Sequence, residues 1–208
     1  KTFSLADLAE QLKLEYRGDG SVQVRGIAKL GDARSDQLAF LFSASYRSQL
    51  EGCEAAAIVL SEADATLTQI PTLLSDQPRL TWARVAEIFD PTPLPSLKVH
   101  ASAVVSDTAS LGSNVSVGPN ATIEAGARIE KDAVIGAGCV IGENTIIGER
   151  TRLEANVTLY HGVEVGADCR IHSSVVLGAD GFGFEFDGAT ASLVKIPQIY
   201  GVQIGDKV

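Results

Sequence analysis

The most regular feature of the sequence is a six-residue spacing of hydrophobic positions in its second half. Every sixth residue from Val99 to Leu177 is Val, Ile or Leu. A second column, two residues before the first, runs from Ala103 to Val175 and contains only small or β-branched side chains. Glycine recurs directly after the aliphatic column, as at Gly118 and Gly142. A fixed period of this kind predicts a repeat architecture.

The period indicates strands, because six residues would spread around all faces of an α-helix with its 3.6 residues per turn. Two inward side chains separated by one outward side chain describe a short strand, and the other three residues of each hexapeptide can turn a corner. We therefore predict a solenoid in which each coil hydrogen-bonds to the next around an aliphatic core. The alternative is an ice-binding or purely structural solenoid, although its regular threonine ladders do not match the mixed outward positions here.

The repeat is interrupted by an excursion loop at about residues 178–203. The spacing resumes at Ile204 with an offset of three residues. The loop contains Phe182, Phe184 and Phe186, although aromatic residues make up only 6% of the chain. Loops that leave a regular scaffold often carry function. Two interpretations stay open: a functional loop, or a hairpin whose rings cover the flank of the solenoid.

Residues 1–97 follow other patterns, which predict a small α/β domain with a proline-rich linker. A capping-box pattern at Ser4 predicts a helix that buries one apolar face, formed by Leu5, Leu8, Ala9 and Leu12. Strands are expected at 22–27, 38–42, 55–60 and 72–75, and helices at 45–50 and 79–89. The apolar contacts of the last helix are expected from Leu80, Ala83, Val85, Ala86 and Phe89. The prolines of residues 90–96 predict a stiff, extended linker.

Composition excludes several classes of protein. With 208 residues and 45% hydrophobic side chains, the chain can form a real core. A net charge of -9 argues against an extended nucleic-acid surface, which needs clustered Lys and Arg. No apolar run is long enough for a membrane span and the first residues lack a signal-peptide pattern, so we expect a cytosolic protein. Cys53, Cys139 and Cys169 are widely spaced and odd in number, which favours reduced thiols over a disulfide framework or a metal site.

One segment of the N-terminal domain carries candidate binding residues. Phe40 and Tyr46 lie six residues apart where a predicted strand gives way to a helix, with Ser43 between them. Two rings at such a turn can hold a planar base, while a small polar side chain contacts its edge. Ordinary core packing of the two aromatic residues is the alternative.

Taken together, these features resemble a known family. The hexapeptides resemble the left-handed parallel β-helix of the hexapeptide-repeat acyltransferases, in which three hexapeptides form one triangular coil. The N-terminal domain, the proline-rich linker, Tyr160-His161, the loop from Gly178 to Phe184 and the run from Lys195 to Ile199 are similar to the UDP-3-O-(3-hydroxyacyl)glucosamine N-acyltransferases of bacterial lipid A biosynthesis. The expected fold is therefore a small α/β domain followed by a left-handed parallel β-helix (residues 98–208), incomplete at its C-terminus.

The resemblance implies a function and a partner set. It implies a cytosolic homotrimer that moves a 3-hydroxyacyl group from acyl carrier protein to the 2-amine of UDP-3-O-acyl-glucosamine. The same resemblance implies no cofactor or metal. Phe40 and Tyr46 match the rings that stack on the uracil. Ser43 stands where the family commonly has Asn, so its shorter side chain would need a bridging water.

The resemblance also bears on the catalytic groups. The family's general base is a histidine in a later repeat, so we expect it C-terminal to Val208, in a part of the protein that this chain lacks. The segment Asp180-Gly181-Phe182 is a candidate for substrate binding. A simple turn-forming role for Asp180, which precedes a glycine, is the equal alternative.

The three histidines do not form an obvious site. His100 and His172 are four coils apart under the family geometry, or about 19 Å, so they cannot meet in one chain. His161 occupies a different position in its hexapeptide, where a subunit contact or the surface is expected. This distribution disfavours the β-helical carbonic anhydrases, which need three histidines around one zinc. Cys139 and Cys169 fall in the inward column and are expected to be core residues.

Two functions remain in view. The first is the N-acyltransferase of lipid A biosynthesis. The second is a non-catalytic solenoid, or an acetyltransferase for another nucleotide sugar or a small amine. Affinity for uridine nucleotides that depends on Phe40 and Tyr46 would separate them.

Overall fold

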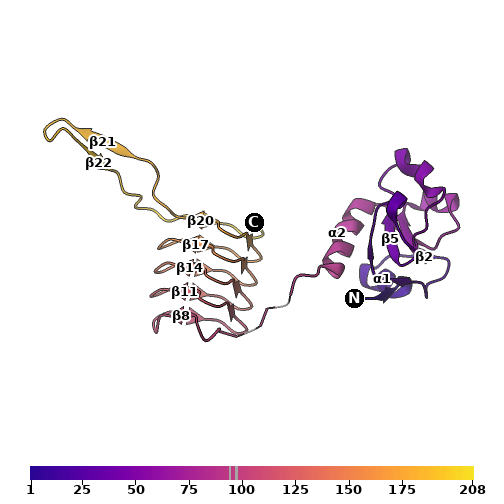
Figure 1. Ribbon diagram of the computed structural model, residues 1–208, viewed down its shortest axis with the longest axis horizontal. Coiled ribbons are helices and arrows are strands. Elements are labelled where there is room, and N and C mark those ends of the chain that lie inside the picture. The colour runs from indigo at the N-terminus through magenta and orange to yellow at the C-terminus, as the bar shows by residue number, and fades with distance from the viewer. Residues whose placement is uncertain (94, 97) are drawn as a thin grey trace. The chain divides into compact units, whose positions relative to one another are not determined.

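The computed structural model describes residues 1–93, 95–96 and 98–208, and these fall into two compact units (Figure 1). The units are Lys1–Pro93 and Leu94–Val208. Leu94 and Leu97 of the predicted linker lie outside the described residues. No helix in the described part of the chain combines the length and the apolar character that crossing a membrane requires.

The first unit is a three-layer α/β domain. Its helices are α1 (Leu5–Leu12), η1 (Leu30–Asp32), η2 (Ala44–Leu50), η3 (Glu62–Leu67) and α2 (Pro78–Phe89), of which the three η elements are 3-10 helices. Its strands are β1 (Phe3–Ser4), β2 (Tyr16–Arg17), β3 (Gln23–Val24), β4 (Gly26–Ile27), β5 (Gln37–Phe40), β6 (Ala57–Leu60) and β7 (Thr72–Leu74). The main sheet has the order β2-β7-β6-β5-β4, in which β4, β5, β6 and β7 run parallel and β2 is antiparallel.

Alternating side chains of the central strands fill two separate cores. Leu38 and Val59 point to one face, where they pack with α1 and α2. Ala39 and Ile58 point to the other face, which carries the 3-10 helices. This alternation follows from the two-residue period of a strand, and it explains why both faces of the sheet are covered.

The predicted N-terminal helix is confirmed in detail. The Ser4 hydroxyl accepts a hydrogen bond from the Asp7 backbone at 3.1 Å, and the Asp7 carboxylate accepts one from the Ser4 backbone at 2.9 Å. This reciprocal capping box satisfies two backbone groups that the first turn would otherwise leave unpaired. The four predicted apolar residues of α1 are buried.

Two details of the prediction for this unit are wrong, whereas the helix predicted at 45–50 is confirmed. The expected strand 22–27 is divided at Arg25: β3 pairs with β1, whereas β4 pairs with β5 of the main sheet. The confirmed helix is the 3-10 helix η2. In α2, Leu80 and Ala83 are exposed, while Thr81 and Val85 are buried, because the buried stripe is centred one residue away from the predicted one.

The second unit is the predicted parallel β-helix. Its strands are β8 (Val104–Val105), β9 (Ser110–Leu111), β10 (Ser116–Val117), β11 (Thr122–Ile123), β12 (Arg128–Ile129), β13 (Val134–Ile135), β14 (Val140–Ile141), β15 (Ile146–Ile147), β16 (Arg152–Leu153), β17 (Thr158–Leu159), β18 (Glu164–Val165), β19 (Arg170–Ile171), β20 (Val176–Leu177), β21 (Phe184–Asp187), β22 (Ser192–Lys195) and β23 (Gln203–Ile204). From β8 to β20, every third strand pairs in one of three parallel sheets, so that Thr122 lies beside Val104 and Val140, each 18 residues away. Three hexapeptides therefore make one coil, as the family resemblance implies.

Both predicted inward columns form the core of the β-helix. Ile123, Ile141 and Leu159, one above the other on successive coils, are at most 1% exposed, and Ala121 and Cys139 are fully buried beside them. The corner glycines permit close stacking. A Cβ atom on Gly118 would lie 2.7 Å from the backbone nitrogen of Ala137 in the next coil.

The excursion loop is an antiparallel hairpin, β21–β22, that projects from the stacked coils near β20 (Figure 1). After it the chain returns as β23, and Ile204 pairs with Val165. The interpretation that its rings cover the flank of the solenoid is wrong within this chain, because Phe182 is 99% exposed and Phe186 is 61% exposed.

Candidate functional site

A pocket of about 300 Å³ lies at the C-terminal end of β5 in the first unit. We call it the Tyr46 pocket. Its lining residues are Lys29, Leu30, Phe40, Phe42, Tyr46 and Gln49. Ligands of open α/β sheets bind beyond the carboxyl ends of the parallel strands, and this pocket occupies such a position.

The aromatic side chains of the pocket come from β5, from η2 and, in the case of Phe42, from the segment between them. Phe40 is the last residue of β5 and is only 4% exposed, whereas Tyr46 on η2 is 44% exposed. The rings of Phe40 and Phe42 stack with centroids 5.8 Å apart and an interplanar angle of 13°. The guanidinium of Arg79, from α2, lies 5.3 Å from the centre of the Phe42 ring. Because the two phenyl rings already contact each other, a planar ligand can pack against them but cannot enter between them.

The structure brings together two of the three residues predicted for this site. Phe40 and Tyr46 line one pocket, whereas Ser43 is not among its lining residues. The Ser43 hydroxyl instead shares a hydrogen bond of 2.7 Å with the Ser45 hydroxyl. Sequence reasoning missed Phe42 and Lys29. The signal for Phe42 was available, because residues two apart in an extended segment point to the same side.

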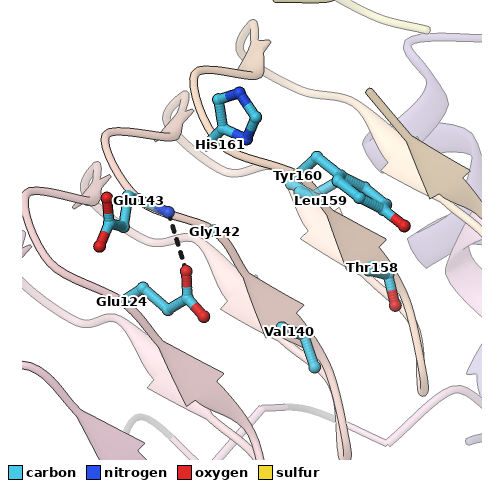
Figure 2. Close-up of a pocket in the computed structure, with 8 residues that line it drawn as sticks. All are labelled: Glu124, Val140, Gly142, Glu143, Thr158, Leu159, Tyr160 and His161. Carbon is cyan, nitrogen blue, oxygen red and sulfur yellow. Dashed lines mark hydrogen bonds between the residues drawn. The ribbon is translucent and has the colours of Figure 1, made fainter. Parts of the chain in front are cut away.

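A second hollow, of about 390 Å³, lies on the outer surface of the β-helix (Figure 2). We call it the His161 hollow. Its lining residues are Glu124, Val140, Gly142, Glu143, Thr158, Leu159, Tyr160 and His161. A Glu124 carboxylate oxygen accepts a hydrogen bond of 3.1 Å from the Glu143 backbone on the next coil. The 18-residue coil places Glu143 and His161 at equivalent corners, so acidic and imidazole groups lie along one edge of the solenoid.

The loop residues Asp180, Gly181 and Phe182 do not line either site. Asp180 accepts a hydrogen bond of 2.8 Å from the Gln198 backbone and forms an ion pair of 2.9 Å with Lys195. These two contacts lower the pKa of the Asp180 carboxyl. Asp180 thus joins the two sides of the hairpin base, and Phe182 projects into solvent. Substrate binding by this segment stays a prediction.

The remaining histidines and the cysteines occupy separate places. The Nδ1 atom of His100 lies 2.9 Å from the Ser102 hydroxyl. Within residues 1–93, 95–96 and 98–208, no three His, Cys, Asp or Glu side chains are grouped so as to hold a metal ion. All three cysteines are free thiols, and burial raises the pKa of the Cys139 thiol, which donates to the Glu154 carbonyl at 3.0 Å.

Comparison with known proteins gives matches to both units. Residues 21–88 match the family described as UDP-3-O-(3-hydroxymyristoyl) glucosamine N-acyltransferase, LpxD. Residues 108–143, 121–154 and 144–179 match the bacterial transferase hexapeptide family. The first range contains the whole Tyr46 pocket, and the three hexapeptide ranges contain the His161 hollow.

Two solved structures from Caulobacter crescentus also match. PerB in complex with CoA and GDP-perosamine is 20% identical, and the match covers 81% of this chain and 100% of PerB with a TM-score of 0.29. A variant of GDP-perosamine N-acetyl transferase in complex with the same two ligands is 16% identical, with the same coverage and a TM-score of 0.17.

The resemblance predicted from the sequence is confirmed by the two family matches. Each family match lies within one unit of the chain, and the order of the two matches along the chain is the predicted one. Residues 21–88 are therefore similar to the UDP-3-O-(3-hydroxymyristoyl) glucosamine N-acyltransferase family, and residues 108–179 are similar to the bacterial hexapeptide transferases.

Proposed function

We propose that this chain belongs to an N-acyltransferase that moves a 3-hydroxyacyl group from acyl carrier protein to the 2-amine of UDP-3-O-acyl-glucosamine, with the Tyr46 pocket holding the uracil. The observation that carries the proposal is the Tyr46 pocket itself, an aromatic pocket inside the segment that matches this family. Its size suits a single planar base better than a whole nucleotide sugar.

The pocket offers two kinds of contact to a nucleotide. The exposed face of Tyr46 and the side of the Phe42 ring supply stacking surface for the base. Lys29, which also lines the pocket and is exposed, supplies a cation for the diphosphate. The edge contact assigned to Ser43 would require a water to bridge the distance to the base.

The chemistry of the transfer sets the remaining requirements. The amine nitrogen attacks the thioester carbonyl, a carbon–nitrogen bond forms, and the carbon–sulfur bond breaks to release the carrier thiol. A general base accepts a proton from the nitrogen and passes it to the departing sulfur, so the carrier leaves as a free thiol and the base is regenerated. We assign this base to no residue of the range 1–208, and the histidine expected after Val208 stands as a prediction. The chain's own proposed role is to bind the nucleotide and to supply the scaffold.

We further propose a homotrimer in which the β-helices pack through one face. The outward residues of the sheet that runs from β8 to β20 are all β-branched, namely Val104, Thr122, Val140, Thr158 and Val176. Val104 and Val176 are 64% and 52% exposed. The other two sheets carry outward arginines. This face carries no charged outward side chain in its strands and exposes valine, which favours association, so Val140→Asp should shift the mass measured by light scattering from three chains to one.

The experiment that tests the proposal is nucleotide binding by calorimetry, with UDP, GDP and ADP compared. We expect UDP to bind most tightly and Tyr46→Ala to weaken it about three- to tenfold, since one aromatic contact is worth about 0.5–1.5 kcal/mol. Tyr16→Ala is the matched control, because Tyr16 is 42% exposed in the same unit but lies outside the pocket. Preference for another nucleotide would instead support an acetyltransferase for a different sugar.

A further inference from the structure

The η2 helix carries Tyr46 and contacts the rest of the domain through the buried side chain of Leu50 and the ion pair of Arg47. It is a 3-10 helix of seven residues, and its N-cap residue Ser43 makes no side-chain capping bond. Helices of this type have poor hydrogen-bond geometry and are short for that reason. The orientation of Tyr46 therefore depends on how η2 is attached to the rest of the domain.

One ion pair attaches η2 to η3. The Nε atom of Arg47 donates to the Asp64 carboxylate at 2.7 Å, and its Nη2 atom lies 2.6 Å from the same oxygen. The second carboxylate oxygen accepts a hydrogen bond of 3.0 Å from the Ser61 hydroxyl. Asp64 is only 8% exposed, so its charge is shielded from water and both of its oxygens are satisfied by neighbours.

The helical period places this ion pair on the side of η2 next to the side that faces the pocket. Residues three apart lie on one side of a 3-10 helix. Tyr46 and Gln49 share one side and line the pocket, while Arg47 and Leu50 share the next side. Leu50 is buried in the core beneath η2, and Arg47 reaches Asp64. One side of η2 is thus fixed to the domain and the adjacent side faces the ligand.

We propose that the Arg47–Asp64 ion pair is a positioning device, which sets the affinity of the Tyr46 pocket by fixing η2 without touching the ligand. This inference rests on the proposed function, because it treats the pocket as the nucleotide site. Arg47 and Asp64 are not among the residues that line that pocket, so they would act only through Tyr46 and Gln49.

A double-mutant cycle with UDP as the probe tests this inference. Arg47→Ala should weaken UDP binding about three- to tenfold, the range set by loss of the Tyr46 contact. In the Tyr46→Ala background the same change should have little further effect, since the group it positions is gone. Arg47→Lys should recover part of the affinity. An equal loss in both backgrounds, or no loss at all, would overturn the proposal.

A matched control comes from the same helix η3. Arg17 pairs with Glu62, at the start of η3, but both side chains are at least half exposed and neither lines the pocket. Arg17→Ala should leave UDP binding unchanged. If Arg47→Ala lowers only the melting temperature, by an amount similar to or larger than Arg17→Ala, and leaves the affinity unchanged, the ion pair is structural and the proposal is wrong.

A measurement without ligand separates this inference from the proposed function. The Tyr46 ring resonances, recorded by NMR on the free protein, should shift and broaden in Arg47→Ala and stay unchanged in Arg17→Ala. If wild-type protein binds no uridine nucleotide but these resonances respond, the proposed function fails and the positioning role stands. If UDP binds normally and the resonances do not respond, the positioning role fails alone.

Discussion

The sequence patterns that determine the two units differ in kind: one repeated pattern determines the β-helix, and several separate patterns determine the α/β domain. In the β-helix one rule, repeated every six residues, determines strand, corner and core, and each coil contacts only its neighbours. In the α/β domain each element has its own signal, and the pocket arises where β5, η1 and η2 meet. A repeated pattern therefore makes a fold predictable from the sequence, whereas a binding site is formed by elements that each occur once and carry separate sequence signals.

The largest expected effect breaks the repeat at its core. Ile147→Ala should destabilise the β-helix by about 2–5 kcal/mol, because the side chain is fully buried. Its neighbour Ile146 points outward from the same strand, so Ile146→Ala should cost much less. Trp82 is the only tryptophan of the sequence and lies in the first unit. In Ile147→Ala, the unfolding midpoint measured by Trp82 fluorescence should therefore stay unchanged. If the free energy of unfolding measured by Trp82 fluorescence falls as much as that measured by circular dichroism, the two units do not unfold separately.

The next effect concerns the corners. Gly118→Ala should destabilise the β-helix by about 1–3 kcal/mol, because its Cβ would lie 2.7 Å from the Ala137 nitrogen and 2.9 Å from the Gly136 carbonyl carbon. Gly205 also follows an aliphatic residue of the repeat, yet no atom lies within 4 Å of its Cβ position. Gly205→Ala is therefore the control in chemical denaturation. Equal midpoints for the two variants would contradict the steric account.

A smaller effect belongs to the α/β domain. Ser4→Ala removes the hydroxyl that caps α1 and should cost about 0.5–2 kcal/mol. The loss should appear in the Trp82 fluorescence transition, while the β-helix transition stays in place. The reverse assignment of the two transitions would contradict the division into units.

The smallest effect is a pH dependence at the hairpin base. Since its contacts with Gln198 and Lys195 lower the pKa of Asp180 in the folded protein, the stabilisation they give is present above the unfolded value of about 3.9. It is lost as the pH falls through the lowered folded value. The Gln198 amide signal, followed by NMR, should therefore titrate with a midpoint below 3.9 and stop titrating in Asp180→Asn. A midpoint at or above 3.9 would contradict the assigned contact.

Most of the fold was predictable from the sequence for physical reasons. The inward columns from Val99 to Leu177 keep a strict six-residue period, which is incompatible with an α-helix. The capping box needs only Ser4 and Asp7, which are three residues apart in the sequence. Local patterns failed where tertiary pairing decides the outcome. The segment 22–27 alternates like one strand, but its two halves pair with different sheets.

The candidate site was only partly predictable. Phe40 and Tyr46 come from one continuous segment, so their proximity followed from sequence spacing. Lys29 and Arg79 come from other elements, and nothing local places them beside Phe42. The Arg47–Asp64 pair joins two 3-10 helices across 17 residues, and only the folded chain brings its members together.

Calorimetric binding of UDP to the wild-type chain and to Tyr46→Ala tests the uridine-nucleotide assignment of the Tyr46 pocket. We expect UDP to bind in preference to GDP and ADP, and the substitution to lower the affinity for UDP alone about three- to tenfold. Absence of UDP binding, or an affinity that Tyr46→Ala leaves unchanged, would contradict the assignment of the pocket to a uridine nucleotide.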